Sequence, residues 1–221
     1  LKELRIKPVL LAPTGRAAKV LARYCGEQAL TIHKRIYRQR TNADYESKFS
    51  LDFNREQGAV FIVDEASMLS DSTGDGALFG SGSLLEDLVS YVRSGRGCRL
   101  ILVGDSAQLP PVGCDFSPAL DPATVSRYGE VVYGLMDEVV RQQMQSGILF
   151  NATLVRCMLE NRIYEIPKFE MDYPDFESVE GGDFMEKLQD AFDRYGRDEV
   201  IVITRSNKRA NRYNEGIRRY I

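Results

Sequence analysis

Short, unbroken apolar runs that end at turn residues are the feature that most limits how this sequence can fold. Five such runs recur along the chain, at residues 9–12, 60–63, 100–103, 131–133 and 200–203. Continuous rather than alternating hydrophobicity is typical of strands covered on both faces of a sheet. Helix-like stretches lie between the runs, at residues 17–24, 84–93, 148–159 and 184–195. This alternation predicts an α/β fold with a mostly parallel sheet.

Composition narrows the class of protein. Hydrophobic residues make up 43% and charged residues 28% of the 221 residues, as in a soluble folded protein. No apolar run approaches the roughly 18–20 residues of a membrane span and no signal-peptide pattern opens the sequence, so we expect a cytoplasmic protein. The four cysteines form no C-x-x-C pair and His33 is the only histidine, which argues against zinc, disulfide and multi-histidine metal sites. Phosphoryl transfer needs no histidine.

Charge is distributed unevenly, although the net charge is only −3. The first forty residues carry ten Lys and Arg but only two Glu, while residues 160–199 are rich in Asp and Glu. A basic N-terminal region suits a polyanionic partner such as a nucleic acid. A solvated helix face with ordinary Lys and Arg explains the same pattern equally well.

Two adjacent carboxylates, Asp64 and Glu65, follow the apolar run 60–63. In an open parallel sheet, ligands bind beyond the carboxyl ends of the strands. A strand-end Asp can hold Mg²⁺ through its water shell, and a neighbouring Glu can orient the water that attacks a γ-phosphate. We therefore predict that Asp64 binds the metal and that Glu65 orients the water. The alternative is a helix start, where both acidic groups offset the helix dipole.

A second polar segment, GDSAQLPPVG at residues 104–113, follows the apolar run 100–103. Gln108 lies just past the predicted strand and can hydrogen-bond a γ-phosphate or the attacking water. The stiff double proline behind it can transmit whether the phosphate is present. Taken alone, Gly-Asp is a common turn and Pro-Pro a common loop stiffener. Two strand-end segments of this kind in one chain favour a phosphate site.

The residues DEASM at 64–68 and G-D-x-x-Q-L-P-P-V-G at 104–113 resemble motifs II and III of the RecD-like, superfamily-one DNA helicases, which include exonuclease V alpha subunits. Residues 11–19, LAPTGRAAK, are similar to motif Ia of this family, and Thr31-Ile32-His33 to the T-x-H segment that follows it. Residues 137–142 resemble the E-V-x-R-Q segment, in which the arginine reaches the γ-phosphate. The similarity extends from about Val9 to Asn214.

This resemblance implies a RecA-like three-layer α/β/α sandwich that uses ATP and Mg²⁺ and moves on single-stranded DNA, with five-prime to three-prime polarity. Residues 1–140 would form the first RecA-like motor domain without its phosphate-binding loop. Residues 141–221 would form linker helices and the start of the second RecA-like domain. Arg141 would act as an arginine finger on the transferred phosphoryl group. The alternative for Arg141 is a surface salt bridge.

The resemblance also implies DNA contacts near the end of the first predicted strand. The residues concerned are Pro13, Thr14, Gly15, Arg16, Lys19 and His33. Backbone N–H groups at a helix start, the Thr14 hydroxyl and the Arg16 and Lys19 charges can grip the phosphates of a single strand. Thr14 can also cap the helix, and the two roles are compatible. His33 can contact DNA or hydrogen-bond internally, and its position leaves both open.

A phosphate-binding loop requires G-x-x-x-x-G-K-[ST], and the sequence contains no Gly-Lys dipeptide. The Gly-rich residues 74–82 contain no lysine and cannot serve instead. We expect that this sequence is an excised piece of a longer helicase, and that the remainder of that helicase is a partner of this chain. The other explanation is a degenerate relative that has lost the loop. The chain alone should bind nucleotide weakly without turning it over. The rival hypothesis is a RecA-like module that binds DNA or protein without catalysis, and a Mg²⁺-dependent nuclease built on Asp64 and Glu65 is less favoured.

Overall fold

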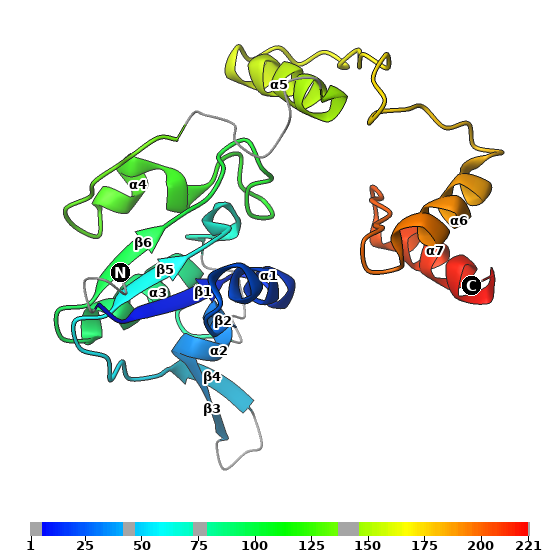
Figure 1. Ribbon diagram of the computed structural model, residues 1–221. Coiled ribbons are helices and arrows are strands. Elements are labelled where there is room, and N and C mark those ends of the chain that lie inside the picture. Colours follow the sequence, from blue (N-terminus) through cyan, green and yellow to red (C-terminus); the bar gives the residue numbers. More distant parts are fainter. Residues whose placement is uncertain (1–5, 42–46, 73–78, 137–145, 221) are drawn as a thin grey trace. The chain divides into compact units, whose positions relative to one another are not determined.

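The computed structural model describes residues 6–41, 47–72, 79–136 and 146–220 (Figure 1). The chain divides into two compact units, Leu1–Asp137 and Glu138–Ile221. Each unit is described by itself below.

A four-stranded parallel sheet forms the centre of the first unit (Figure 1). Its order is β2-β1-β5-β6, with β2 at Ala29–Thr31, β1 at Pro8–Ala12, β5 at Val60–Val63 and β6 at Arg99–Leu102. Helices α1 (Gly15–Cys25), α2 (Ile32–Ile36) and α3 (Leu84–Ser94) flank it. The predicted RecA-like α/β fold with a parallel sheet is confirmed.

One face of this sheet carries most of the core. The strand register places Val9 beside Phe61 and Phe61 beside Leu100, and repeats the arrangement two residues later with Leu11, Val63 and Leu102. These side chains pack with Leu85, Leu88 and other apolar residues of α2 and α3. Burial of a side chain such as Phe61 contributes about 1.5–3 kcal/mol.

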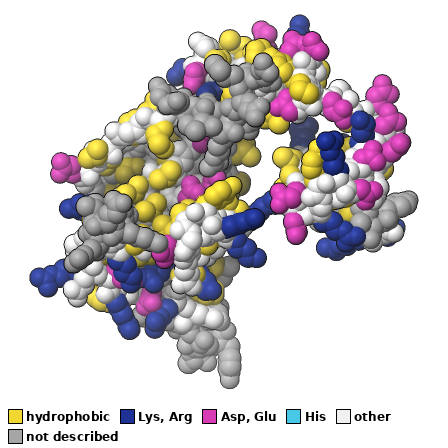
Figure 2. Space-filling model, viewed as in Figure 1, with side chains coloured by type: hydrophobic (Ala, Val, Ile, Leu, Met, Phe, Trp, Pro, Cys, Tyr) yellow, Lys and Arg dark blue, Asp and Glu magenta, His cyan; other side chains and the backbone are white. Residues whose placement is uncertain are grey.

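The opposite face of the sheet is covered unequally among the described residues. Leu10 of β1 is buried there, but Ile101 of β6 is 44% exposed. Figure 2 shows hydrophobic side chains at the surface of the first unit. The prediction of strands covered on both faces is therefore correct for β1 and β5 and wrong for β6, the strand at the edge of the described sheet.

Helices α1 and α3 begin at side-chain caps. The Thr14 hydroxyl accepts a hydrogen bond from the N–H of Ala17 at 3.2 Å, and the Ser83 hydroxyl accepts one from the N–H of Glu86 at 3.2 Å. Such caps stabilise a helix by about 1 kcal/mol each, since they satisfy otherwise unpaired N–H groups. Helix α1 ends at Gly26, whose φ of 63° is a left-handed conformation that glycine adopts without strain.

Strands β3 (Tyr37–Thr41) and β4 (Ser47–Leu51) form a separate antiparallel hairpin. It is joined to the rest of the unit by aromatic packing, with the rings of Phe49 and Phe79 stacked at 4.5 Å. The hydroxyl of Tyr37 donates to the Asp87 carboxylate at 2.7 Å. Burial and this hydrogen bond both raise the pKa of Tyr37. Three short helical segments complete the unit: η1 (Ala66–Met68), η2 (Pro118–Leu120) and α4 (Pro122–Ser126).

Two of the predicted strands are not formed. Residues 131–133 and 200–203 have no strand conformation, and Val132 is 95% exposed. A strand needs a neighbouring strand to satisfy its backbone N–H and C=O groups, and neither run pairs with a strand in the described ranges. Apolar character alone therefore did not produce a strand at these two places.

The second unit consists of helices α5 (Gly147–Glu160), α6 (Phe184–Tyr195) and α7 (Asn207–Tyr220). The helices predicted at 148–159 and 184–195 are therefore present. Asp175 fixes the start of α5, because its carboxylate accepts hydrogen bonds from the Ser146 hydroxyl and the N–H of Gly147. None of the helices in the described ranges combines the length and the apolar character needed to cross a membrane.

Candidate functional site

The candidate site lies at the carboxyl ends of β1, β5 and β6. Asp64 directly follows β5, and its N–H donates to the carbonyl oxygen of Leu11 in β1 at 3.0 Å. Its carboxylate accepts a hydrogen bond from the N–H of Glu65 at 3.0 Å. Both acidic residues are half-buried. The strand pairing thus holds the predicted metal-binding carboxylate at the edge of the sheet where ligands of parallel sheets bind.

Glu65 has an unusual backbone conformation. Its φ of 55° and ψ of 37° are left-handed, a region that costs a residue other than glycine roughly 1–2 kcal/mol. The alternative role of an acidic helix start receives little support, since the following helix η1 has only three residues and the Glu65 side chain makes no capping hydrogen bond to it. Strained residues of this kind concentrate at functional sites.

The segments after β5 and β6 are in direct contact. The N–H of Ala66 donates to the carbonyl oxygen of Val103 at 2.9 Å. A Cβ atom on Gly104 would lie 3.0 Å from the backbone nitrogen of Ser67, so a side chain here would crowd the backbone after β5. The structure therefore brings the Asp64–Glu65 pair and the start of the 104–113 segment together at one edge of the sheet.

Gln108 lies one turn further along the same segment. The Asp105 carboxylate accepts a hydrogen bond from the N–H of Ala107 at 2.9 Å, and the Asp105 carbonyl oxygen accepts one from the N–H of Gln108 at 3.1 Å. Asp105 thus folds the turn that presents Gln108, whose side chain is exposed. Our sequence reasoning did not assign this role to Asp105, although an Asp two residues before the bonded N–H is a recognisable turn signal. Arg141, the predicted arginine finger, lies outside the described residues.

The predicted DNA-binding residues at the end of β1 form an exposed cationic tip. Thr14 caps α1, so this alternative role is present, and Pro13 and Gly15 lie on either side of it. Arg16 and Lys19 are exposed on the first turns of α1. Neither cation forms an ion pair with any residue in the described part of the chain. The geometry is compatible with a phosphate contact and does not require one.

His33 lies in the aromatic cluster next to the hairpin. Its ring centroid is 5.0 Å from that of Phe79 and 5.6 Å from that of Tyr37. Burial lowers the pKa of His33, which favours the neutral imidazole. The structure shows a packing role for His33, and its predicted contact with DNA stays a prediction.

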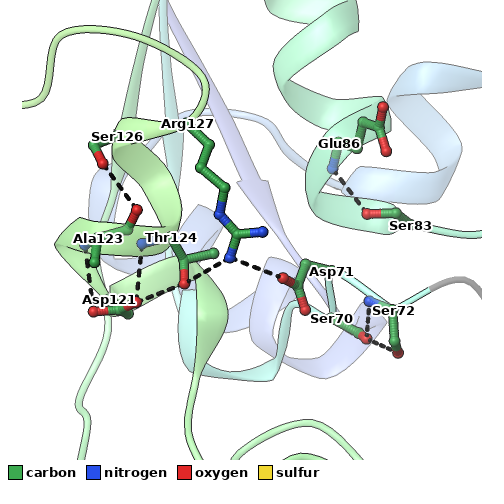
Figure 3. Close-up of polar contacts among 10 residues, drawn as sticks. All are labelled: Ser70, Asp71, Ser72, Ser83, Glu86, Asp121, Ala123, Thr124, Ser126 and Arg127. Carbon is green, nitrogen blue, oxygen red and sulfur yellow. Dashed lines mark hydrogen bonds and ion pairs between the residues drawn. The ribbon is translucent and has the colours of Figure 1, made fainter.

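An additional polar connection, absent from our sequence reasoning, joins the chain after η1 to α4 (Figure 3). The Arg127 guanidinium lies 3.7 Å from the Asp71 carboxylate and donates to the Thr124 hydroxyl at 3.2 Å. The Asp121 carboxylate caps α4 by accepting from the N–H of Thr124 at 2.9 Å. Hydrogen bonds from Thr124 are the main cause of the lowered pKa of Asp121. Because Arg127 is largely exposed, its ion pair contributes at most about 1 kcal/mol.

The residues at the strand ends fit the Mg²⁺-binding part of a nucleotide–Mg²⁺ site but not its phosphate-binding part. No group of three or more His, Cys, Asp or Glu side chains able to hold a metal occurs in the ranges that the structure describes. Asp64 alone can still hold Mg²⁺, an ion that keeps several waters and takes its remaining ligands from substrate phosphates. The phosphate cradle itself does not fit, since the sequence carries no G-x-x-x-x-G-K-[ST] segment.

A family model described as an AAA domain matches residues 1–114, slightly more than half of the 221 residues. The chain therefore belongs to this family. The match identifies the region as superfamily-one-like and helicase-like, of the P-loop NTPase type, and indicates use of a nucleotide and a metal in general. It covers β1, β5, β6 and the segment that carries Gln108.

Proposed function

We propose that this chain is the water-activating and coupling part of a RecD-like helicase motor that uses ATP hydrolysis to move along single-stranded DNA. The observation that carries the proposal is the contact between the segments after β5 and β6. Through the Ala66–Val103 hydrogen bond and the close approach at Gly104, the segments that carry the Asp64–Glu65 pair and the Gln108 turn are in contact at one edge of the sheet. A motor needs this connection, because a change sensed at the phosphate must move the adjoining protein.

Each residue has a distinct part in the proposal. Bound ATP and Mg²⁺ would supply the phosphoryl group and neutralise its charge. Asp64 would hold the hydrated metal and Glu65 would orient the attacking water. Gln108 would report the presence of the γ-phosphate through the Asp105 turn, and Arg141 would stabilise the developing charge.

DNA would lie across the same edge of the sheet. Arg16 and Lys19 would neutralise phosphates, while the backbone around Thr14 fixes the register of the strand. Pro13 and Gly15 would allow the close approach of the backbone, and His33 would contribute a contact at the border of the site. Arg and Lys are suited to this role because their charges release counterions from the polyanion.

We further propose that residues 1–140 are the first motor domain and that residues 141–221 are linker helices and the start of the second RecA-like domain. Since the sequence contains no Gly-Lys dipeptide, the chain by itself should not turn over ATP. DNA-stimulated release of phosphate by the purified chain, measured with malachite green, would contradict this part of the proposal.

If the reading frame upstream of Leu1 encodes a phosphate-binding loop, the catalytic assignment is tested in that longer product. Glu65→Gln keeps the size of the side chain but removes the carboxylate, and should lower the kcat of DNA-stimulated ATP hydrolysis by roughly 100-fold or more. Glu130→Gln is the matched control, because Glu130 is exposed and its neighbour Gly129 lies beside Arg93, in the last turn of α3. Equal kcat values for the two variants would contradict the assignment of Glu65.

A second candidate is a non-catalytic RecA-like module that binds DNA or a partner protein. This candidate is consistent with a sequence that contains no G-x-x-x-x-G-K-[ST] segment. The coding sequence upstream of Leu1 separates the two candidates: a strand followed by G-x-x-x-x-G-K-[ST] selects the motor, and its absence selects the module.

A further inference from the structure

The loop after β6 exposes large apolar side chains at the strand-end edge. Leu109 is 85% exposed, Val112 is fully exposed and Phe116 is 60% exposed. The loop is held in shape by the Asp105 turn, by the double proline at 110–111 and by a hydrogen bond from the N–H of Cys114 to the Pro111 carbonyl oxygen at 3.0 Å. An ordered loop that presents apolar groups to solvent indicates a contact surface.

Phe116 forms one wall of a hollow next to this loop. The hollow has a volume of about 360 Å³ and is lined by Ser106, Phe116, Ser117, Leu120 and Asp121. An exposed aromatic face beside an apolar wall and an ionised carboxylate suits a planar ring that also carries hydrogen-bonding groups. Nucleobases have this chemistry, and every base offers a face that can stack on an aromatic ring.

Exposed positive charge lies on the same edge of the sheet. Arg16 and Lys19 follow the carboxyl end of β1, and β5 is the only strand between β1 and β6 in the described sheet. Neighbouring strands are spaced by about 4.8 Å, so the ends of β1 and β6 are about 10 Å apart. A cationic tip and an aromatic surface that follow two strand ends this close together fit a strand whose phosphates and bases point in different directions. Charge complementarity therefore favours a single-stranded nucleic acid over an uncharged partner.

We propose that Phe116 stacks a base of the single strand whose phosphates Arg16 and Lys19 hold. This inference rests on the DNA-binding part of the proposed function and adds a residue outside the motifs that suggested it. Phe116 is a binding residue in this role. Because stacking is not ionic, its contribution should differ from that of the cations in its dependence on salt and on the presence of bases.

The test measures binding of the full 221-residue chain to fluorescein-labelled oligonucleotides by anisotropy, over a series of salt concentrations. The two probes are a dT tract and an abasic tract of equal length. Phe116→Leu keeps an apolar side chain without the ring, and should bind the dT tract roughly tenfold more weakly while its affinity for the abasic tract is unchanged. Phe116→Trp should restore dT binding. Arg16→Ala should instead weaken binding of both probes and lower the salt slope by about one.

Phe53→Leu is the matched control for the loss of an exposed ring. Phe53 is 67% exposed and precedes β5, so it lies towards the amino ends of the strands, at the opposite edge. The Phe53→Leu variant should bind both probes with the same affinity as the unmodified chain. Circular dichroism and the Tm of each variant verify that the fold is retained.

Any of the following outcomes would overturn the inference. Phe116 does not stack a base if Phe116→Leu binds dT as tightly as the unmodified chain, or if it loses affinity for the dT and abasic tracts equally. In both cases the proposed phosphate contacts of Arg16 and Lys19 are not contradicted. If the unmodified chain binds neither probe, the DNA-binding part of the proposed function fails together with this inference. If the chain self-associates through this loop and Phe116→Leu yields monomers with unchanged dT affinity, the surface is an interface between copies.

Discussion

The apolar runs at 60–63 and 200–203 have almost the same character, yet only the first is a strand. In the first unit, β5 lies between β1 and β6, and the side chains of Phe61 and Val63 are fully buried. Residues 200–203 have no strand partner in the described ranges, and Ile203 is almost completely exposed. The comparison shows that apolar residues provide the driving force for burial, while neighbouring strands decide whether the backbone can use it.

The largest expected effect tests this difference directly. Phe61→Ala should lower the free energy of unfolding by about 3–5 kcal/mol, because it leaves a cavity in the core of the first unit. Ile203→Ala should change it by no more than about 0.5 kcal/mol, since the side chain is exposed. Urea unfolding followed by circular dichroism measures both. A comparable loss for Ile203→Ala would show that residues 200–203 are packed in solution.

Ion pairs allow the same comparison between the units. Glu56 is mostly buried and accepts hydrogen bonds from Lys7 at 2.7 Å and Arg35 at 2.6 Å, whereas the Lys187–Glu177 pair of the second unit is exposed. Glu56→Gln should cost roughly 1.5–3 kcal/mol at pH 7, and Glu177→Gln less than about 1 kcal/mol.

The pH dependence of this effect has a definite sign. The hydrogen bond from Lys7 is the main cause of the lowered pKa of Glu56. The stabilisation is therefore present above pH 4.5, the ordinary value, and is lost as the pH falls below it. The difference in unfolding free energy between the unmodified chain and Glu56→Gln should shrink from pH 7 to pH 3.5. A constant difference would indicate a steric effect of the substitution.

Two glycines allow a comparison between a backbone segment in close contact and one with open space around it. Gly104→Ala should destabilise the first unit by about 1–3 kcal/mol, because the new methyl group would meet the backbone of Ser67. Gly134→Ala, in the unpaired segment after 131–133, has open space around its Cβ and should be neutral or slightly stabilising. The Tm values of the two variants show which substitution destabilises the chain more. Equal Tm values would mean that the segments after β5 and β6 separate easily.

The smallest effect concerns His33. Burial lowers its pKa from the ordinary 6.5, so the folded chain binds a proton less readily than the unfolded chain. This contribution to stability is present above pH 6.5 and is lost as the pH falls towards the lowered pKa. His33→Gln, which does not titrate in this range, should show a flatter Tm profile between pH 7.5 and 5.5. A profile parallel to that of the unmodified chain would contradict the assignment.

Much of the fold and the position of the candidate site followed from sequence because both depend on short segments. The runs 9–12, 60–63 and 100–103 became parallel strands, and parallel strands necessarily place their carboxyl ends at one edge. Asp64 and the 104–113 segment therefore had to meet once the order of the strands was given. The wrong predictions at 131–133 and 200–203 concern segments whose conformation depends on a partner strand.

Other features depend on contacts that no local pattern encodes. The left-handed backbone of Glu65 accompanies the bond between Ala66 and Val103, which lie on different strand-end segments. His33 packs against Phe79, a residue distant in sequence, and burial lowers the pKa of its imidazole. The Arg127–Asp71 pair likewise forms only after α4 has packed near η1. Such features become readable only when the tertiary structure is known.

The backbone of Glu65 has a consequence for protein engineering. Selection for heat resistance alone would favour Gly or Asn at this position, because both tolerate a φ of 55° better than Glu does. The same exchange would delete the carboxylate that we propose to orient water. Variants selected in the laboratory for heat resistance alone should therefore lose the carboxylate at position 65. Variants selected for both heat resistance and activity should retain the strained Glu65.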